Sequence, residues 1–122
     1  MNKDIEISML IDFYGEILKP KQLEIIDCYY NKDLSLSEIS ANIGITRQGV
    51  LESIKRSESL LYEMESKLNM VKRFTILSDG IEKIKKLAYS IKNDGAGVTN
   101  ESIVKNASEI LGISEKLHNC LS

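Results

Sequence analysis

The sequence predicts an all-α protein that carries a helix-turn-helix followed by a helical extension. Apolar residues recur at spacings of three and four over most of the 122 residues, and no segment alternates as a strand does. Leu, Ile, Glu and Lys are plentiful while Pro occurs once, a composition that favours helices. The segment LSLSEISANIGITRQGVLESIKR, residues 34–56, has the pattern of a helix-turn-helix.

Two helices are predicted before this segment, one over residues 5–18 and one over residues 20–30. Pro20 separates them, because proline disfavours helix at the residue before it and fits well in the first turn of the next helix. The first helix has apolar residues in steps of four, which we expect to form its buried face. These residues are Ile5, Met9, Phe13 and Ile17.

The first helix of the helix-turn-helix is predicted over residues 36–42. Ser35 and Glu38 have the spacing of a capping box, which begins a helix. Ser40 is small enough for the point where two helices cross, and Gly44 can adopt the positive φ that the turn requires. We expect the apolar anchors on both sides of the turn to be Ile39, Ile43, Ile45, Val50 and Ile54.

The second helix is predicted to begin at Arg47, to be capped by Thr46 and to continue past Leu68. In DNA-binding proteins of this kind the start of this helix faces the major groove. Arg and Gln side chains recognise the edges of guanine and adenine. Gly49 is unexpected within the helix and costs it roughly 0.5–1 kcal/mol relative to Ala. The predicted contact residues for nucleic acid or another partner are Thr46, Arg47, Gln48, Lys55 and Arg56.

The C-terminal part predicts two more helical segments. The phase of the apolar stripe changes along it, so we expect a kink or short break at residues 78–80. Residues 93–97, NDGAG, predict a loop. Thr99 is then expected to cap a last helix, which Gly112 can interrupt.

We divide the chain into a helix-turn-helix domain, residues 1–70, and a helical extension, residues 71–122. The apolar residues near this boundary resemble a heptad seam and exceed what one small core can bury. We expect both the C-terminal helices and a second subunit to cover them, in a two-fold homodimer built on the C-terminal half. The seam consists of Leu60, Leu61, Met64, Leu68 and Val71.

The distribution of charge bears on the choice of partner. The net charge is −2, and residues 1–60 hold seven Lys/Arg against ten Asp/Glu. Neutralisation of phosphates supplies most non-specific DNA affinity, so the acidic half opposes unaided DNA binding. A basic run in the C-terminal part favours either a solvated helix face or a cationic contact for RNA or acidic protein. It comprises Lys83, Lys85, Lys86 and Lys92.

The composition predicts a non-enzymatic, cytoplasmic protein without a metal or cofactor. His118 is the only histidine, and Cys28 and Cys120 lie far apart, so no ordinary metal site or nucleophile–base pair can be assembled. The chain begins MNKD, without the basic start and apolar run of a signal peptide, and no apolar stretch is long enough to span a membrane.

Several short segments carry a resemblance to a known family. They are DFYG at 12–15, KQ at 21–22, YY at 29–30, LSLSEI at 34–39, TRQ at 46–48 and IKR at 54–56. Through them, residues 10–61 resemble the YlxM-like helix-turn-helix proteins of Gram-positive bacteria. The helix-turn-helix by itself also resembles region 4 of bacterial sigma factors, of the winged-helix-like DNA-binding superfamily type.

The resemblance implies a small cytoplasmic regulatory protein of the signal recognition particle pathway. The genes of this family are commonly neighbours of those for the particle's GTPases, and the implied partner is a GTPase, the particle's RNA, or both. No catalytic residue carries over, and Arg47, Gln48, Lys55 and Arg56 match polar positions of the family's helix. The alternatives are a dimeric DNA-binding transcription regulator and a purely structural assembly factor.

Overall fold

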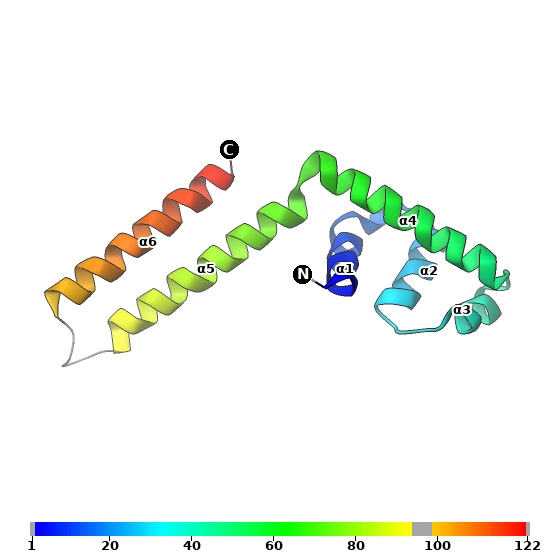
Figure 1. The fold of residues 1–122 in the computed structure, drawn as a ribbon, viewed down its shortest axis with the longest axis horizontal. Coiled ribbons are helices and arrows are strands. Elements are labelled where there is room, and N and C mark those ends of the chain that lie inside the picture. Colours follow the sequence, from blue (N-terminus) through cyan, green and yellow to red (C-terminus); the bar gives the residue numbers. More distant parts are fainter. Residues whose placement is uncertain (1, 94–98, 122) are drawn as a thin grey trace. The chain divides into compact units, whose positions relative to one another are not determined.

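The computed structural model describes residues 2–93 and 99–121, and every regular element in these ranges is a helix (Figure 1). They fall in two compact units, Met1–Val71 (unit 1) and Lys72–Ser122 (unit 2). The all-α prediction is confirmed, whereas the domain boundary at residue 70 stays a prediction about independent folding. The helices are α1 (Lys3–Tyr14), the 3₁₀ helix η1 (Gly15–Ile17), α2 (Pro20–Tyr30), α3 (Leu36–Ile43), α4 (Arg47–Leu68), α5 (Met70–Asn93) and α6 (Asn100–Cys120).

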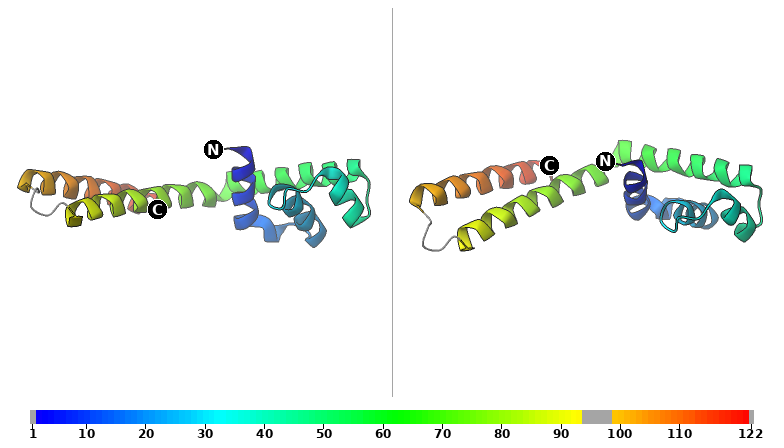
Figure 2. Two further views of the ribbon diagram at one scale, coloured as in Figure 1. Left: turned by 90° about the horizontal axis from the view of Figure 1, so that it is seen from below. Right: turned by 60° about the horizontal axis from the view of Figure 1, so that its bottom comes forward.

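The first hydrophobic cluster of unit 1 lies where α1 packs against α2 and the C-terminal half of α4. Figure 2 shows α1 crossing α4. Removing this apolar surface from water contributes about 25 cal/mol per Å² and is the main force holding the three helices together. The buried members are Ile7, Leu10, Ile11, Tyr14, Leu18, Ile26, Leu61 and Val71.

The predicted buried face of α1 is half right, because Met9 and Phe13 pack against the first cluster but the other two residues do not. Ile5 and Ile17 are 55% and 47% exposed, whereas Ile7 and Leu10 are at most 1% exposed. The N-terminal segment has apolar residues on two sides, so its spacing matches two stripes. Packing against α2 and α4 selects the stripe through Ile7 and Leu10. The helix also ends at Tyr14 and continues as η1.

The second hydrophobic cluster is the core of the helix-turn-helix, between α2, α3 and the first half of α4. Its buried members are Ile25, Ile39, Val50 and Ile54. Ile43 packs against the edge of this cluster, as expected of an anchor. Ile45 is 38% exposed, so its predicted role as an anchor is wrong. It lies in the turn, and its backbone oxygen accepts a hydrogen bond from the Ser40 hydroxyl.

A single residue, Asn69, separates α4 from α5 and has a left-handed backbone with φ 54°. The Tyr14 hydroxyl donates to Oε1 of Glu65 (2.6 Å) and accepts from the amide of Met70 (3.1 Å). The amide of Val71 donates to the same Glu65 oxygen (3.0 Å). Side chains from α1 and α4 thus satisfy the first amides of α5, which have no partner within their own helix.

The break predicted at residues 78–80 is also wrong, because α5 is continuous through them. Gly80 is buried, and a Cβ added there would lie 2.4 Å from Cδ2 of Leu117 on α6. The glycine therefore allows α6 to approach. An interior glycine costs a helix only about 1 kcal/mol relative to Ala, so the helix persists. The change in apolar phase belongs to the break at Asn69.

Unit 2 contains α5 from Lys72 onward and α6, which lie side by side in Figures 1 and 2 and run in opposite directions. Oγ1 of Thr99 accepts from the amide of Ser102 (3.1 Å), which confirms the predicted cap of α6. The expected interruption at Gly112 is wrong, since α6 continues through it. Of the predicted loop at 93–97, Asn93 ends α5 and the other residues lie outside the described ranges.

The predicted heptad seam is divided between the core and the surface. Leu61, Met64 and Val71 belong to the first hydrophobic cluster, where α1 and α2 cover them. Leu60 and Leu68 are 37% and 43% exposed. Unit 1 therefore covers three of the five seam residues within itself, whereas the second subunit stays a prediction.

Ser57 provides a test of packing along α4. It is fully buried, and among the described residues its hydroxyl has no hydrogen-bond partner. A buried hydroxyl without a partner costs about 1–3 kcal/mol. We expect Ser57→Ala to raise the free energy of unfolding by about 1.5 kcal/mol in urea denaturation at neutral pH, combining this relief with a small gain in helix propensity.

The matched control is Ser59→Ala on the exposed side of the same helix, where the hydroxyl donates to the Lys55 carbonyl oxygen. This variant gains the same helix propensity, about 0.5 kcal/mol, without relieving a buried hydroxyl. Equal effects of the two substitutions, or a loss of stability in Ser57→Ala, would show that the buried hydroxyl carries no penalty.

Tyr30 makes the stability of unit 1 sensitive to alkaline pH. Burial, and then its hydrogen bond to the carboxylate of Glu58, raise the pKa of the Tyr30 hydroxyl above its ordinary value of 10.0. Because the unfolded chain loses this proton at a lower pH than the folded chain, the stabilisation is complete below pH 10 and is lost as the pH rises through the folded-state pKa.

We therefore expect the free energy of unfolding to fall as the pH rises above about 10, the ordinary pKa of tyrosine. Tyr30→Phe should lower stability by about 2 kcal/mol at neutral pH and flatten this fall. Tyr29→Phe is the control, since its ring stays beside that of Tyr30 at 5.0 Å. An equally steep fall in Tyr30→Phe would remove Tyr30 as the titrating group.

Candidate functional site

The turn of the helix-turn-helix is built by short-range hydrogen bonds. Oγ of Ser35 accepts from the amide of Glu38 and a Glu38 carboxylate oxygen accepts from the amide of Ser35, both at 3.1 Å, which confirms the capping box. Gly44 ends α3 with φ 82°, and its amide donates to the Ser40 carbonyl oxygen (2.9 Å). A residue with a Cβ disfavours this backbone, so glycine sets the angle between α3 and α4.

The five predicted contact residues are all exposed. Thr46 caps α4, and its Oγ1 accepts from the amide of Gly49 (3.0 Å). A Cβ added at Gly49 would lie 3.1 Å from that same oxygen, which gives the unexpected glycine a local reason. Thr46 therefore positions the start of α4, and the longer side chains that follow it extend into solvent.

These longer side chains do not form one cluster. Gln48, Glu52 and Lys55 are spaced by four and three residues, so they share the side of α4 opposite its buried residues. Arg47 and Arg56 are nine positions apart, which places them on opposite flanks of that side. We call this surface the α4 outer face: Gln48, Glu52 and Lys55, with Arg47 and Arg56 as its flanks.

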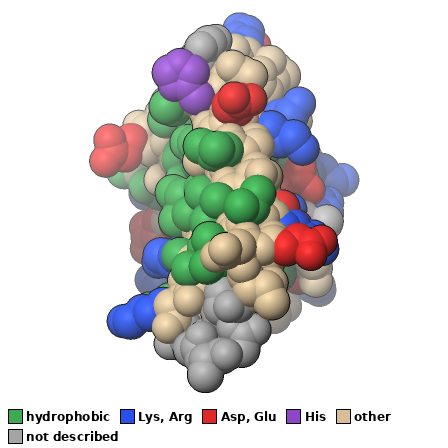
Figure 3. All heavy atoms as spheres, turned by 90° about the vertical axis from the view of Figure 1, so that its left-hand side faces the viewer, with side chains coloured by type: hydrophobic (Ala, Val, Ile, Leu, Met, Phe, Trp, Pro, Cys, Tyr) green, Lys and Arg blue, Asp and Glu red, His purple; other side chains and the backbone are tan. Residues whose placement is uncertain are grey.

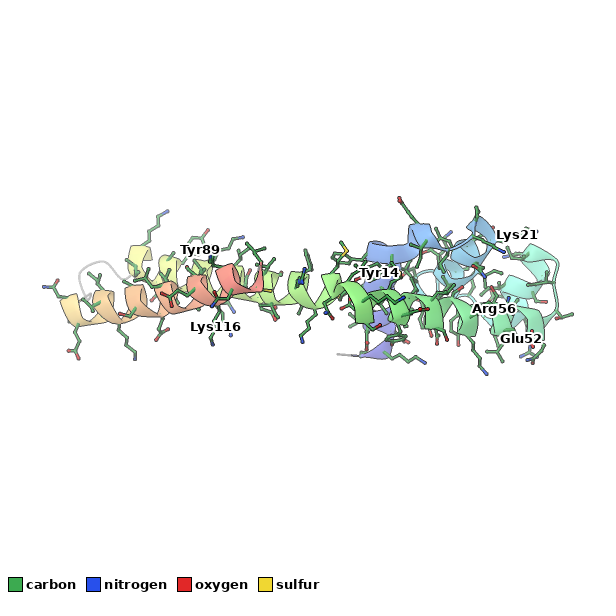
Figure 4. The ribbon with its side chains drawn as sticks, turned by 90° about the horizontal axis from the view of Figure 1, so that it is seen from above. Tyr14, Lys21, Glu52, Arg56, Tyr89 and Lys116 are labelled. Carbon is green, nitrogen blue, oxygen red and sulfur yellow. The ribbon has the colours of Figure 1, made fainter. Side chains whose placement is uncertain are left out.

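Figure 4 shows Glu52 and Arg56 on α4 and Lys21 from the start of α2 at the same end of unit 1. The sequence alone does not show that Lys21 lies at this end, because α2 and α4 meet only in the folded unit. Nε2 of Gln48 approaches Oε1 of Glu52 at 3.5 Å, a long hydrogen bond. Within the described ranges, Arg47, Lys55 and Arg56 make no ion pair, so their charges are available to a partner.

The α4 outer face belongs to an acidic unit. Residues 1–71 hold eight Lys/Arg and twelve Asp/Glu, a net charge of −4, whereas residues 72–122 hold eight and six, a net charge of +2. Glu52 lies in the middle of the outer face, where a carboxylate would oppose an approaching phosphate. The face is therefore of mixed charge and lacks the dense positive potential typical of unaided nucleic-acid binding.

The basic run of unit 2 does not form a cationic face. Lys83 lines a shallow hollow between α5 and α6 together with Lys116. Lys85 and Lys92 border another hollow beside Tyr89, on a different side of α5. Tyr89 and Lys116 lie on opposite sides of the α5–α6 pair in Figure 4. The lysines are distributed around the helix, which is typical of a solvated surface.

The structure also contains an acidic hollow of about 320 Å³ that the sequence did not indicate. Its lining includes Asp4, Asp33 and Glu38 together with Tyr29 and Tyr30. Among the described residues, no three His, Cys, Asp or Glu side chains are arranged as metal ligands. No helix in the described part of the chain is long and apolar enough to cross a membrane.

The capped α3, the left-handed Gly44 and the exposed start of α4 define the chain as a helix-turn-helix protein. The model of the family described as "Putative helix-turn-helix protein, YlxM / p13 like" matches residues 1–100. The chain belongs to this family, UPF0122, which confirms the resemblance found in the sequence.

Several curated relatives carry the same family name. A UPF0122 protein of Acetivibrio thermocellus is 39% identical over 109 residues, which cover 89% of this chain and 93% of the relative. One of a Thermoanaerobacter species is 48% identical over 80 residues, 66% of this chain and 68% of the relative. One of Malacoplasma penetrans is 45% identical over 80 residues, 66% of this chain and 75% of the relative.

Proposed function

We propose that this chain is a regulatory helix-turn-helix protein of the signal recognition particle pathway, and that it binds the pathway's GTPase through the α4 outer face. The pathway is the one that the YlxM-like family resemblance implies. The observation that carries the mode of binding is the mixed charge of an exposed helix face on an acidic unit.

A face of this kind suits a protein surface better than a polyanion. Gln48 and Lys55 donate hydrogen bonds while Glu52 accepts them, so a partner with both basic and acidic groups can satisfy all three. A phosphate backbone can satisfy only the donors, and it leaves Glu52 beside like charge. Binding to RNA of the particle remains the second form of the same proposal, with Lys21 and the two flanking arginines as phosphate contacts.

The direct test is affinity purification of the tagged full chain from lysate, with the sample divided into nuclease-treated and untreated halves. We expect the particle's GTPase in both halves for the wild-type chain. Arg47→Glu combined with Lys55→Glu should abolish its recovery, because both changes reverse charge on the α4 outer face without touching the core. Recovery is measured by quantitative mass spectrometry.

The matched control is Lys83→Glu combined with Lys86→Glu, which makes the same charge change on exposed positions of α5. It should leave recovery unchanged. GTPase recovered only without nuclease would assign the contact to RNA. Full recovery by the Arg47 and Lys55 variant would show that the α4 outer face is not the binding surface.

A transcription regulator is the second candidate function, and the intact turn favours it. Gly44 and the Thr46 cap present Arg47 and Gln48 at the exposed start of α4, where recognition helices of this class contact base edges. If this function holds, Arg47→Ala should weaken binding to one DNA sequence by about 1–3 kcal/mol more than to others in a competition assay. An equal loss for every sequence would count against base recognition.

A further inference from the structure

The two units differ in how far they bury their apolar side chains. Unit 1 contains two hydrophobic clusters with fully buried members. In unit 2 the described residues of α6 include none that is buried, although the helix is 21 residues long. Helices in proteins are stabilised mainly by packing of an apolar face, so a pair of helices with so little burial is incomplete as a folding unit.

Each helix of unit 2 has one apolar stripe toward the other helix and a second stripe that remains exposed. The inner stripes follow three- and four-residue spacings through Leu77, Gly80 and Ile84 on α5, and through Ile110, Ile113 and Leu117 on α6. The exposed stripes comprise Phe74, Ile81 and Ala88 on α5, and Val104, Ala107 and Leu111 on α6 with Leu121 directly after its end.

The two exposed stripes lie on the same side of the hairpin. When either helix is viewed along its own chain direction, the exposed stripe is rotated about a quarter turn around the helix axis from the inner stripe. The direction of this rotation is the same in both helices. Because α5 and α6 run in opposite directions, the same sense of rotation brings both stripes to one side. Figure 3, viewed from the left-hand side of Figure 1, shows a band of hydrophobic side chains with the histidine at its upper end. We call this surface the hairpin apolar face.

The opposite side of the hairpin is charged. The shallow hollow there is lined by Asp79, Lys83 and Lys116, with Ile76 as its exposed apolar member. Only one side of unit 2 is thus suited to burial. On the hairpin apolar face, a shallow groove runs along α5 between Phe74 and Lys85, and side chains of another helix can pack into it.

We propose that a second copy of this chain covers the hairpin apolar face, so that two hairpins form a four-helix bundle. A two-fold axis lets one apolar face meet its own copy, which is the usual way in which soluble chains dimerise. The larger side chains of the face are 48–69% exposed and leave roughly 100 Å² each, or roughly 500 Å² per copy. A stable interface takes ~800 Å² from each partner, so small and flanking side chains have to contribute the remaining ~300 Å².

The charges of the two helices favour a second copy placed with α5 beside the partner's α6. From residue 72 onward α5 holds six Lys/Arg and two Asp/Glu, whereas α6 holds two Lys and three Glu. Two α5 helices side by side would repel each other. Lys85, Lys92 and Glu82 flank the exposed stripe of α5, and Glu115 flanks that of α6, so the α5 edge of the interface is mainly basic and the α6 edge is acidic.

Size-exclusion chromatography with light scattering of the full chain at micromolar concentration tests the proposal. The wild type should have twice the mass of the 13.7 kDa chain. Leu111→Lys should raise the dissociation constant roughly 100-fold and give the single-chain mass, because a charge replaces a side chain at the centre of the interface. Leu111→Met, which keeps the volume, should remain a dimer.

The matched control is Ile76→Lys, the same kind of change on the charged side of the hairpin, and it should remain a dimer. Amide hydrogen exchange gives a second readout that does not depend on the variants: protection of α5 and α6 should rise with wild-type concentration. A wild-type monomer with concentration-independent protection would mean that another part of the same chain covers the face, and would overturn the proposal. Dissociation by Ile76→Lys as complete as by Leu111→Lys would overturn it as well.

Discussion

The structure of unit 1 depends on one constraint, which is that a single face of α4 must fill two hydrophobic clusters. Val50 and Ile54 complete the core of the helix-turn-helix, and Leu61 completes the cluster under α1. Ser57 lies between them, fully buried. Because one rigid helix joins both clusters, the turn at Gly44 and the packing of α1 cannot vary independently. The same commitment of one side to the core leaves the opposite side, the α4 outer face, available to a partner.

Local hydrogen bonds then decide where α4 begins and ends. At its start, the Thr46 hydroxyl oxygen accepts a hydrogen bond from the amide of Gly49. This cap sets the residue at which α4 begins, and with it the direction in which the side chains of Arg47 and Gln48 point into solvent. At its end, Asn69 has a left-handed backbone conformation. The hydrogen-bonded side chains of Tyr14 and Glu65 accept hydrogen bonds from the first two amides of α5. The position of the α4 outer face is therefore set by the Thr46 cap at the start of α4 and by the Tyr14 hydrogen bonds at its end. It does not depend on the side chains of the face.

The two units use their apolar residues in different ways. Unit 1 buries its own and presents a polar face of mixed charge, which we propose binds the GTPase. Unit 2 leaves apolar side chains exposed along one side, which we propose binds a second copy. Since these surfaces lie on different helices, association through the hairpin uses none of the residues of the α4 outer face. A dimer built in this way would present two such faces, and the affinity for a partner with two sites would rise without any new contact.

The sequence by itself determined the features that depend on neighbouring residues. Residues within one helical turn are enough to predict the bounds of α2, the capping box of α3, the turn at Gly44 and the cap at Thr46, because each depends on the local geometry of Pro, Ser, Gly or Thr. The exposure of the candidate contact residues follows from the same local features. Only the tertiary structure decided which of two apolar stripes of α1 is buried, that Ile45 lies at the surface and that Gly80 serves helix packing instead of a break. It also decided that Lys21 and Arg56 lie at the same end of unit 1. The physical reason is that a spacing of three or four residues describes any apolar stripe equally well, and the choice between stripes depends on which neighbouring helix is there to cover them.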